Sequence, residues 1–125
     1  MRTDTTILVI DDERVILETI SEIFRDEYNI IKAQSADDGL RIIRKVSLDL
    51  IITDCMMPGQ LSGLTLAKTL HFENNHIPII MISGSDISKA ALGWGVKEFI
   101  SKPFEIGQLR RAVQSCLQPK LRLLA

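Results

Sequence analysis

The sequence has little cysteine, few aromatic residues and no long apolar run. Its two cysteines, Cys55 and Cys116, stand far apart and form no Cys-x-x-Cys pair, so we expect free, buried thiols. The longest apolar runs, such as residues 77–82, are far shorter than the roughly 20 residues of a membrane span. The N-terminus shows neither the apolar stretch nor the small-residue cleavage site of a secretory signal. A cytoplasmic protein without a membrane contact is therefore expected.

The sequence also lacks an excess of either charge. Fifteen Lys and Arg residues stand against 16 Asp and Glu residues, which argues against a protein whose main activity is non-specific binding to nucleic acid. A length of 125 residues suits one domain with a real core, and 46% hydrophobic residues are typical of a soluble protein. We expect a single domain over residues 1–125, in which 118–125 are a linker or the end of the last helix.

Short β-branched runs alternate with stretches of helical periodicity. The runs are largely apolar, as in strands that are covered on both faces. They lie at residues 6–10, 30–33, 50–53, 79–82 and 98–101. Apolar residues at helical spacing lie near 15–24, 40–46, 64–70, 90–94 and 109–117. With Gly39 and other glycines and prolines at the joints, this pattern predicts a parallel sheet with helices on both faces, but it does not give the strand order.

Charged and hydroxyl side chains follow four of the expected strands, at the edge where ligands bind in such folds. In chain order these residues are Asp11, Asp12, Glu13, Asp54, Ser83 and Lys102. Each type has an ordinary structural explanation, because aspartates cap helices and start turns, and surface lysines are usually solvated. Clustered carboxylates, however, repel one another unless a cation offsets their charge, and Mg²⁺ prefers carboxylate ligands. The edge is therefore predicted to hold Mg²⁺, and Asp54 is either an aspartate that starts a turn or a carboxylate nucleophile.

Four segments in this order resemble the receiver domain of two-component response regulators. They read ILVIDDE at 7–13, DLIITDCMMPG at 49–59, PIIMISGS at 78–85 and FISKPF at 99–104. The resemblance covers residues 6–117. It implies an α/β, flavodoxin-like fold, a doubly wound five-stranded parallel sheet in the order 2-1-3-4-5 with five helices.

The resemblance also implies a role for each matching residue. Asp54 corresponds to the phosphoacceptor, which takes a phosphoryl group from a sensor histidine kinase or a phosphotransfer protein. Lys102 corresponds to the lysine that offsets phosphoryl charge, and a cis bond before the proline that follows it would aim this lysine. In the family, Mg²⁺ is held by the residues that correspond to Asp11, Asp12, Asp54 and the backbone carbonyl of Met56.

A conformational switch is implied by two further matches. Ser83 corresponds to the hydroxyl that bonds the phosphoryl group, and Phe99 to the aromatic residue that then turns inward. Because phenylalanine lacks a hydroxyl, its part in a switch must act by packing. The switch changes the face formed by the helix near 90–94, the strand at 98–101 and the helix near 109–117. That face would control an output domain or partner protein, and a homodimer through it is left open.

The positions two residues beyond the phosphoacceptor and the switch hydroxyl are Met56 and Ser85. In the family these positions flank the water that hydrolyses the phosphoryl group. The thioether of Met56 is a weak acceptor without a donor, so it orients a water poorly. We therefore predict slow self-dephosphorylation.

The loop after Asp54 departs from the common family pattern. The usual glycine lies eight residues after the phosphoacceptor, whereas Gly63 is the ninth residue after Asp54. One residue is thus inserted near Gln60. It forms either a surface bulge without effect or a shift of the third helix that alters partner contacts.

Three other functions compete with a phosphoacceptor switch, which is a signalling domain rather than an enzyme. A haloacid-dehalogenase-type phosphatase would have a second acid two residues after its nucleophile, where this chain has Met56. A receiver-like module that only binds protein would be expected to lose an acid or the lysine, and all are present. A flavodoxin-like cofactor site would need a phosphate loop where this chain has Asp11 and Asp12.

Overall fold

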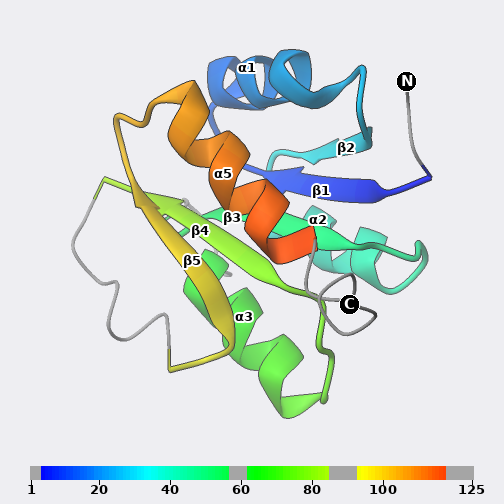
Figure 1. The fold of residues 1–125 in the computed structure, drawn as a ribbon. Helices are drawn as coiled ribbons and strands as arrows, with labels where there is room; N and C mark the ends of the chain where they lie inside the picture. The colour runs from blue at the N-terminus through cyan, green and yellow to red at the C-terminus, as the bar shows by residue number, and fades with distance from the viewer. Residues whose placement is uncertain (1–3, 57–61, 85–92, 118–125) are drawn as a thin grey trace, which may run out of the picture.

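The computed structural model describes residues 4–56, 62–84 and 93–117, and its strands and helices alternate along the chain (Figure 1). The five strands are β1 (Thr6–Ile10), β2 (Asn29–Ala33), β3 (Leu50–Asp54), β4 (Ile79–Ser83) and β5 (Val96–Ser101). The helices of the described residues are α1 (Arg14–Phe24), α2 (Ala36–Ile43), α3 (Gly63–Phe72) and α5 (Ile106–Leu117). The five predicted strands are confirmed to within two residues at each end.

The sheet is parallel throughout, and its order is β2-β1-β3-β4-β5. This order confirms the fold expected from the resemblance. In the register of the two central strands, Ile10 lies beside Thr53, so the residues that follow them, Asp11 and Asp54, leave neighbouring strands side by side. The topology therefore brings residues that are 43 positions apart in the sequence to one edge of the sheet.

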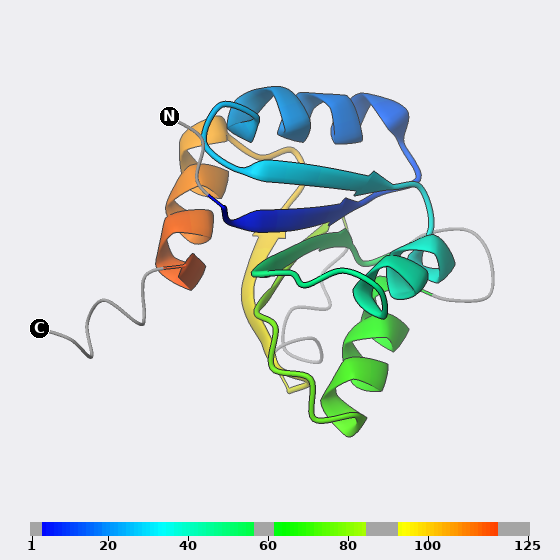
Figure 2. The same ribbon diagram turned by 90° about the vertical axis from the view of Figure 1, so that its right-hand side faces the viewer.

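Two apolar layers hold this edge in place. Helices α1 and α5 lie on one face of the sheet, and α2 and α3 lie on the other (Figures 1 and 2). Along β1, Ile7 and Val9 pack against the first layer, and Leu8 and Ile10 pack against the second. Strands β3 and β4 are buried along their whole length. Because each large buried side chain contributes about 1.5–3 kcal/mol, the strand ends are anchored in a well-stabilised core.

Helix α2 begins four residues before the start that its apolar spacing predicts. Ser35 is its N-cap, and the Ser35 hydroxyl accepts the backbone N–H of Asp38 at 3.1 Å. Gly39 is therefore inside the helix and is not a joint. A Cβ atom at Gly39 would lie 2.4 Å from Cδ1 of Ile10, so the glycine lets α2 approach β1 closely. The helix also ends early, which leaves Val46 38% exposed.

Some predictions fall on residues that the structure does not describe. The helix expected near 90–94 lies largely within residues 85–92, which are outside the described residues. Gln60, Ser85 and residues 118–125 are outside them as well. Within the described residues, no helix has the length and apolar character needed to cross a membrane.

Candidate functional site

A cluster of three carboxylates lies at the carboxyl edge of the sheet. Asp11 follows β1, and Asp54 is the last residue of β3; they are only 2% and 6% exposed. One carboxylate oxygen from each of Asp11, Asp12 and Asp54 lies within 4.8 Å of the others. Neither Asp11 nor Asp12 caps α1, whose N-cap is Glu13. The capping explanation is thus wrong for this pair, and Asp11 Oδ1 instead accepts the Glu13 N–H at 2.9 Å.

Lys102 reaches this cluster from the end of β5. Its backbone N–H donates to the carbonyl of Ser83 at 2.9 Å, which ties the loop after β5 to the end of β4. Its Nζ atom lies 3.1 Å from Asp11 Oδ2 and 3.4 Å from Asp54 Oδ2. The peptide bond between Lys102 and Pro103 is cis, the form that would aim this lysine. The predicted nucleophile, one of the predicted metal ligands and the lysine are therefore in contact.

The single charge of Lys102 does not balance the charges of the buried carboxylates. Burial raises the pKa of Asp54, and the charge of Lys102 only partly counters it. Burial likewise raises the pKa of Asp11, although the hydrogen bond from the Glu13 N–H and the contact with Lys102 act to lower it. Burial alone would lower the pKa of Lys102, but its hydrogen bond to Asp11 and the charges of both aspartates outweigh burial and raise that pKa. A cation bound at this edge would relieve the excess of negative charge.

The donor chemistry fits Mg²⁺. Among the described residues, Asp11, Asp12 and Asp54 are the group of three His, Cys, Asp or Glu side chains placed closely enough to hold a metal ion. Carboxylate oxygens are the ligands that Mg²⁺ takes in proteins, together with water. Because two of the three carboxyls are desolvated, a divalent cation would replace solvation that they have lost on folding.

The loop that follows Asp54 returns to it at Gly63. The Gly63 N–H donates to the carbonyl of Cys55 at 3.0 Å, and Ser62 caps α3 through the N–H of Thr65 at 3.1 Å. A Cβ atom at Gly63 would lie 2.0 Å from the backbone oxygen of Asp54, so the contact requires glycine. The start of α3 is therefore packed directly on the phosphoacceptor candidate, with Gln60 itself outside the described residues.

Three of the four remaining predicted residues are among the described residues. Ser83 ends β4 next to β3 and is 1% exposed, and Phe99 is half-buried in β5 beside Met81. Phe99 packs on the layer that contains α3. Met56 is 63% exposed, two residues beyond Asp54. Ser85 lies outside the described residues.

Sequence reasoning missed one contact of the cluster. The Oε1 atom of Glu13 lies 3.4 Å from Nζ of Lys102, which makes Glu13 a third carboxylate partner of the lysine. The sequence shows that Glu13 follows two acids. Its spacing does not show which way the side chain turns, and this direction depends on the path of the loop into α1.

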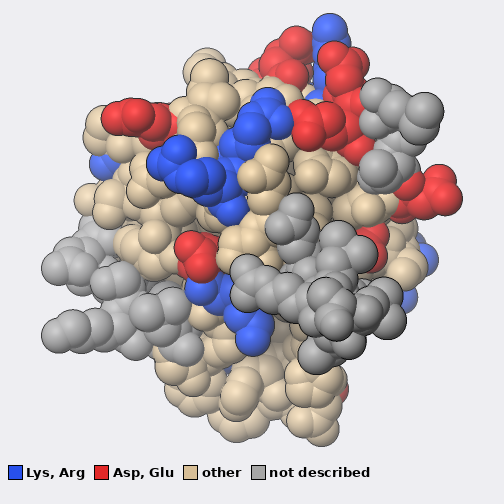
Figure 3. Space-filling model, in the orientation of Figure 1, with Lys and Arg blue, Asp and Glu red and all other residues tan. Residues whose placement is uncertain are grey.

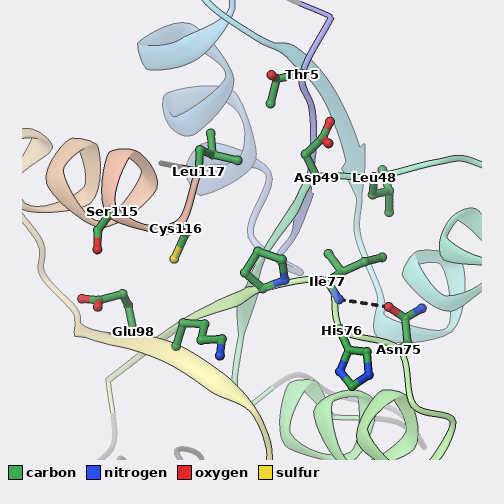
Figure 4. A pocket seen from close by; sticks show the side chains of 12 residues that line it. Thr5, Leu48, Asp49, Asn75, His76, Ile77, Glu98, Ser115, Cys116 and Leu117 are labelled. Carbon is green, nitrogen blue, oxygen red and sulfur yellow. Dashed lines mark hydrogen bonds between the residues drawn. The ribbon is translucent and has the colours of Figure 1, made fainter. Parts of the chain in front are cut away.

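A cavity of about 930 Å³ lies at the opposite, amino end of the sheet (Figure 4). Its lining comes from the segments just before β1, β3 and β4, from the start of β5 and from the end of α5. It includes Asp49, His76, Glu98 and Cys116. None of the predicted site residues lines it. The site is thus defined by converging charges and not by a deep cavity.

The fold and the acid–lysine cluster define the class, a flavodoxin-like α/β protein with its polar site at the carboxyl edge. A profile of the response regulator receiver domain family matches residues 7–114. The chain therefore belongs to this family, and its function is phosphorelay signal transduction in two-component systems. Such domains act with histidine kinases and output domains.

Individual relatives agree with this assignment. The heme response regulator HssR of Staphylococcus saprophyticus is 34% identical over 118 residues, which cover 91% of this chain and 52% of HssR. Histidine kinase P4 of Formosa agariphila is 29% identical over 97% of this chain and 9% of its own length. A receiver domain structure from Clostridium thermocellum is 31% identical with a TM-score of 0.85, covering 97% of this chain and 99% of that one. The chain spans about half the length of HssR.

Proposed function

We propose that Asp54 is the phosphoacceptor of this receiver domain. The observation that carries the proposal is a buried carboxylate at the end of a central strand, 3.4 Å from a lysine and within 4.8 Å of two further carboxylates. Among the described acids, Asp11 shares this burial, the contact with Lys102 and the cation-binding group. The phosphoacceptor role is assigned to Asp54 because the family has its phosphoacceptor at the end of the third strand.

The reaction is a transfer between two bound groups. A carboxylate oxygen of Asp54 attacks the phosphorus of a phosphohistidine on the donor protein and forms an acyl phosphate. The phosphorus–nitrogen bond breaks, and its electron pair stays on the imidazole nitrogen. Lys102 Nζ, already 3.4 Å from Asp54 Oδ2, then pairs with a phosphoryl oxygen. Mg²⁺, held by Asp11, Asp12, Asp54 and the carbonyl of Met56, supplies charge stabilisation when bound.

The phosphoryl group then acts on two neighbouring residues. Ser83, at the end of the adjacent strand, donates its hydroxyl to a phosphoryl oxygen. Phe99 turns inward by packing, because it has no hydroxyl to bond. Together these two residues shift the equilibrium between two conformations of the face around β5 and α5. That face controls an output domain, a partner protein or a second copy of the chain.

The cellular setting follows from the same chemistry. We place the domain in the cytoplasm, where a sensor histidine kinase or a phosphotransfer protein phosphorylates it. Basic side chains on the face drawn in Figure 3 are interspersed with acidic ones, which does not favour direct binding to nucleic acid. The domain is a phosphoacceptor and not an enzyme with a separate substrate, and it loses its phosphoryl group slowly because Met56 orients water poorly. The partner position, Ser85, tunes the same step.

The test is the intact mass after incubation with Mg²⁺ and acetyl phosphate. The wild-type chain should gain one phosphoryl group, and Asp54→Asn should gain none. Asp49→Asn is the matched control, because Asp49 is an acid next to the other end of β3, and it should behave as wild type. A chelator should suppress the gain. Phosphorylation of Asp54→Asn at the wild-type level would overturn the assignment.

A further inference from the structure

The side chain of Glu13 does not serve the helix that it starts. Glu13 is the N-cap of α1, with extended backbone angles of φ −88° and ψ 113°, yet its side chain makes no capping hydrogen bond. N-cap positions favour short polar side chains that accept the N–H groups of the first turn. The Glu13 carboxylate instead turns to Lys102 at 3.4 Å. Its role is therefore to be sought at the site and not in α1.

Lys102 has three carboxylate partners that differ in their burial. The side chains of Asp11 and Asp54 are 2% and 8% exposed, whereas that of Glu13 is 61% exposed. The three protons of an ammonium group suffice for all three partners. Asp11 and Asp54 are fixed at strand ends. Glu13 is the partner that can move into solvent when another anion takes its place at Lys102.

Charge around the cluster is unevenly balanced. The carboxylates of Asp11, Asp54 and Glu13 contact the ammonium of Lys102, and Asp12 lies beside Asp11 and Asp54. The four carboxylates and one ammonium have a formal excess of three negative charges. A divalent cation is attracted by this excess. An incoming phosphoryl group is repelled by it, and the group also needs Lys102. The charge of Glu13 therefore acts in opposite directions on the two ligands.

We propose that Glu13 is a positioning residue for Lys102, which it holds in the resting domain and releases to the phosphoryl group. This inference rests on the proposed function of Asp54. It makes cation binding tighter and phosphoryl uptake slower than either would be without Glu13. Ion pairs this exposed are weak, so the expected change in each equilibrium or rate is only about two- to fivefold.

The experiment compares Glu13→Gln with Glu22→Gln in the full chain. Glu22 is a matched control, because its side chain on α1 is also 61% exposed and pairs with Arg25 at 3.0 Å, away from the site. Mg²⁺ affinity is measured by NMR titration without a phosphodonor, and phosphoryl uptake by intact mass at saturating Mg²⁺ with acetyl phosphate. Glu13→Gln should weaken Mg²⁺ binding and speed uptake, each about two- to fivefold. Glu22→Gln should change neither.

A third variant separates charge from contact. Glu13→Asp keeps the charge but shortens the side chain, so it should retain the wild-type Mg²⁺ affinity. Its uptake should be faster than that of the wild type, by the part that comes from releasing Lys102, and slower than that of Glu13→Gln. Slower uptake in Glu13→Gln at saturating Mg²⁺ would mean that Glu13 supports Lys102, and it would overturn the inference. Unchanged Mg²⁺ binding and uptake would do the same. A wild-type chain that takes up no phosphoryl group refutes the proposed function instead, while the Mg²⁺ titration still tests the charge of Glu13.

Discussion

The two ends of the sheet carry polar side chains in different ways. At the amino end, two of the polar side chains that line the cavity accept backbone N–H groups. Asp49 accepts the Thr6 N–H at 2.9 Å, and Asn75 accepts the Ile77 N–H at 3.1 Å (Figure 4). At the carboxyl end, Asp11 and Asp54 come from different strands and share one lysine. The cavity thus lies at the end of the sheet where these carboxylate and amide groups pair with backbone, and the converging charges lie at the other end. Desolvated charge that converges from separate strands indicates chemistry better than cavity volume does.

The largest expected effect tests how tightly the carboxyl end is packed. Gly63→Ala places a Cβ atom 2.0 Å from the Asp54 backbone oxygen, and backbone can yield little. We expect a loss of about 3 kcal/mol in the free energy of unfolding, at the upper end for overpacking. Phosphoryl uptake should fall as well, because the clash moves Asp54. Urea denaturation measures the first effect, and intact mass the second.

Two other glycines are the controls for that experiment. Gly84 has open space around its Cβ position, so Gly84→Ala should change stability by less than about 0.5 kcal/mol. Gly95, near the amino end, has a φ of +84° and no close neighbour, so Gly95→Ala should cost about 1 kcal/mol through backbone strain alone. Equal costs at Gly63 and Gly84 would show that Asp54 is not held by a close backbone contact.

The second prediction compares the effects on stability of Asp54, the last residue of β3, and Asp49, the residue before its start. Burial raises the pKa of Asp54, so the folded chain holds this proton more tightly than the unfolded chain. The stability that protonated Asp54 gives is present below the ordinary aspartate pKa and is lost as the pH rises through the raised folded value. Without divalent cations at pH 7, Asp54→Asn should therefore stabilise the fold by about 0.5–2 kcal/mol.

Asp49→Asn should act in the opposite direction. Its carboxylate accepts the Thr6 N–H at 2.9 Å, and loss of the charge weakens that bond, at a cost of about 0.5–1.5 kcal/mol. Urea denaturation at pH 4 and pH 7 measures both variants. The gain in Asp54→Asn should shrink at the lower pH. Stabilisation that is independent of pH would rule out the charge of Asp54 as its cause.

The sequence predicted the sheet and most of the site, because both depend on short-range signals. Apolar β-branched runs mark strands that are buried on both faces, and the residues just after parallel strands must share one edge. Asp11, Asp12, Asp54 and Lys102 were therefore predictable as a group. Their roles in phosphotransfer remain predictions until phosphorylation is measured.

What could not be predicted depends on three-dimensional contacts. A glycine such as Gly39 usually marks a joint between elements, but Gly39 lies inside α2. Its reason is a contact in three dimensions, because a Cβ atom there would clash with Ile10. Ser35 and the two acids in the first turn mark the true start of α2. The prediction from apolar spacing missed this start, because the apolar residues at helical spacing begin only at residue 40. The contact of Glu13 with Lys102 joins two loops 89 residues apart, and no local pattern encodes it.

The smallest expected effect is on the reactivity of the two thiols, Cys55 at the carboxyl end of the sheet and Cys116 at the amino end. Burial, with the charge of Glu98, raises the pKa of Cys116 beside the amino-end cavity to about 11. Burial and the charge of Asp54 raise the pKa of Cys55, which is 0% exposed. The thiolate is the reactive form, so only about 0.1% of Cys116 is reactive at pH 8.

Alkylation with iodoacetamide, read out by peptide mass, measures this difference. Labelling of Cys116 should be slow at pH 8 and should rise about tenfold for each pH unit below its pKa. Cys55 should stay unlabelled until the chain is unfolded, because the core covers it. The same peptides from urea-unfolded protein give the reference rates. Rapid labelling of Cys116 at pH 7 would mean that its thiol is solvated. The amino end of the sheet would then leave the pKa of this thiol as it is on an open surface.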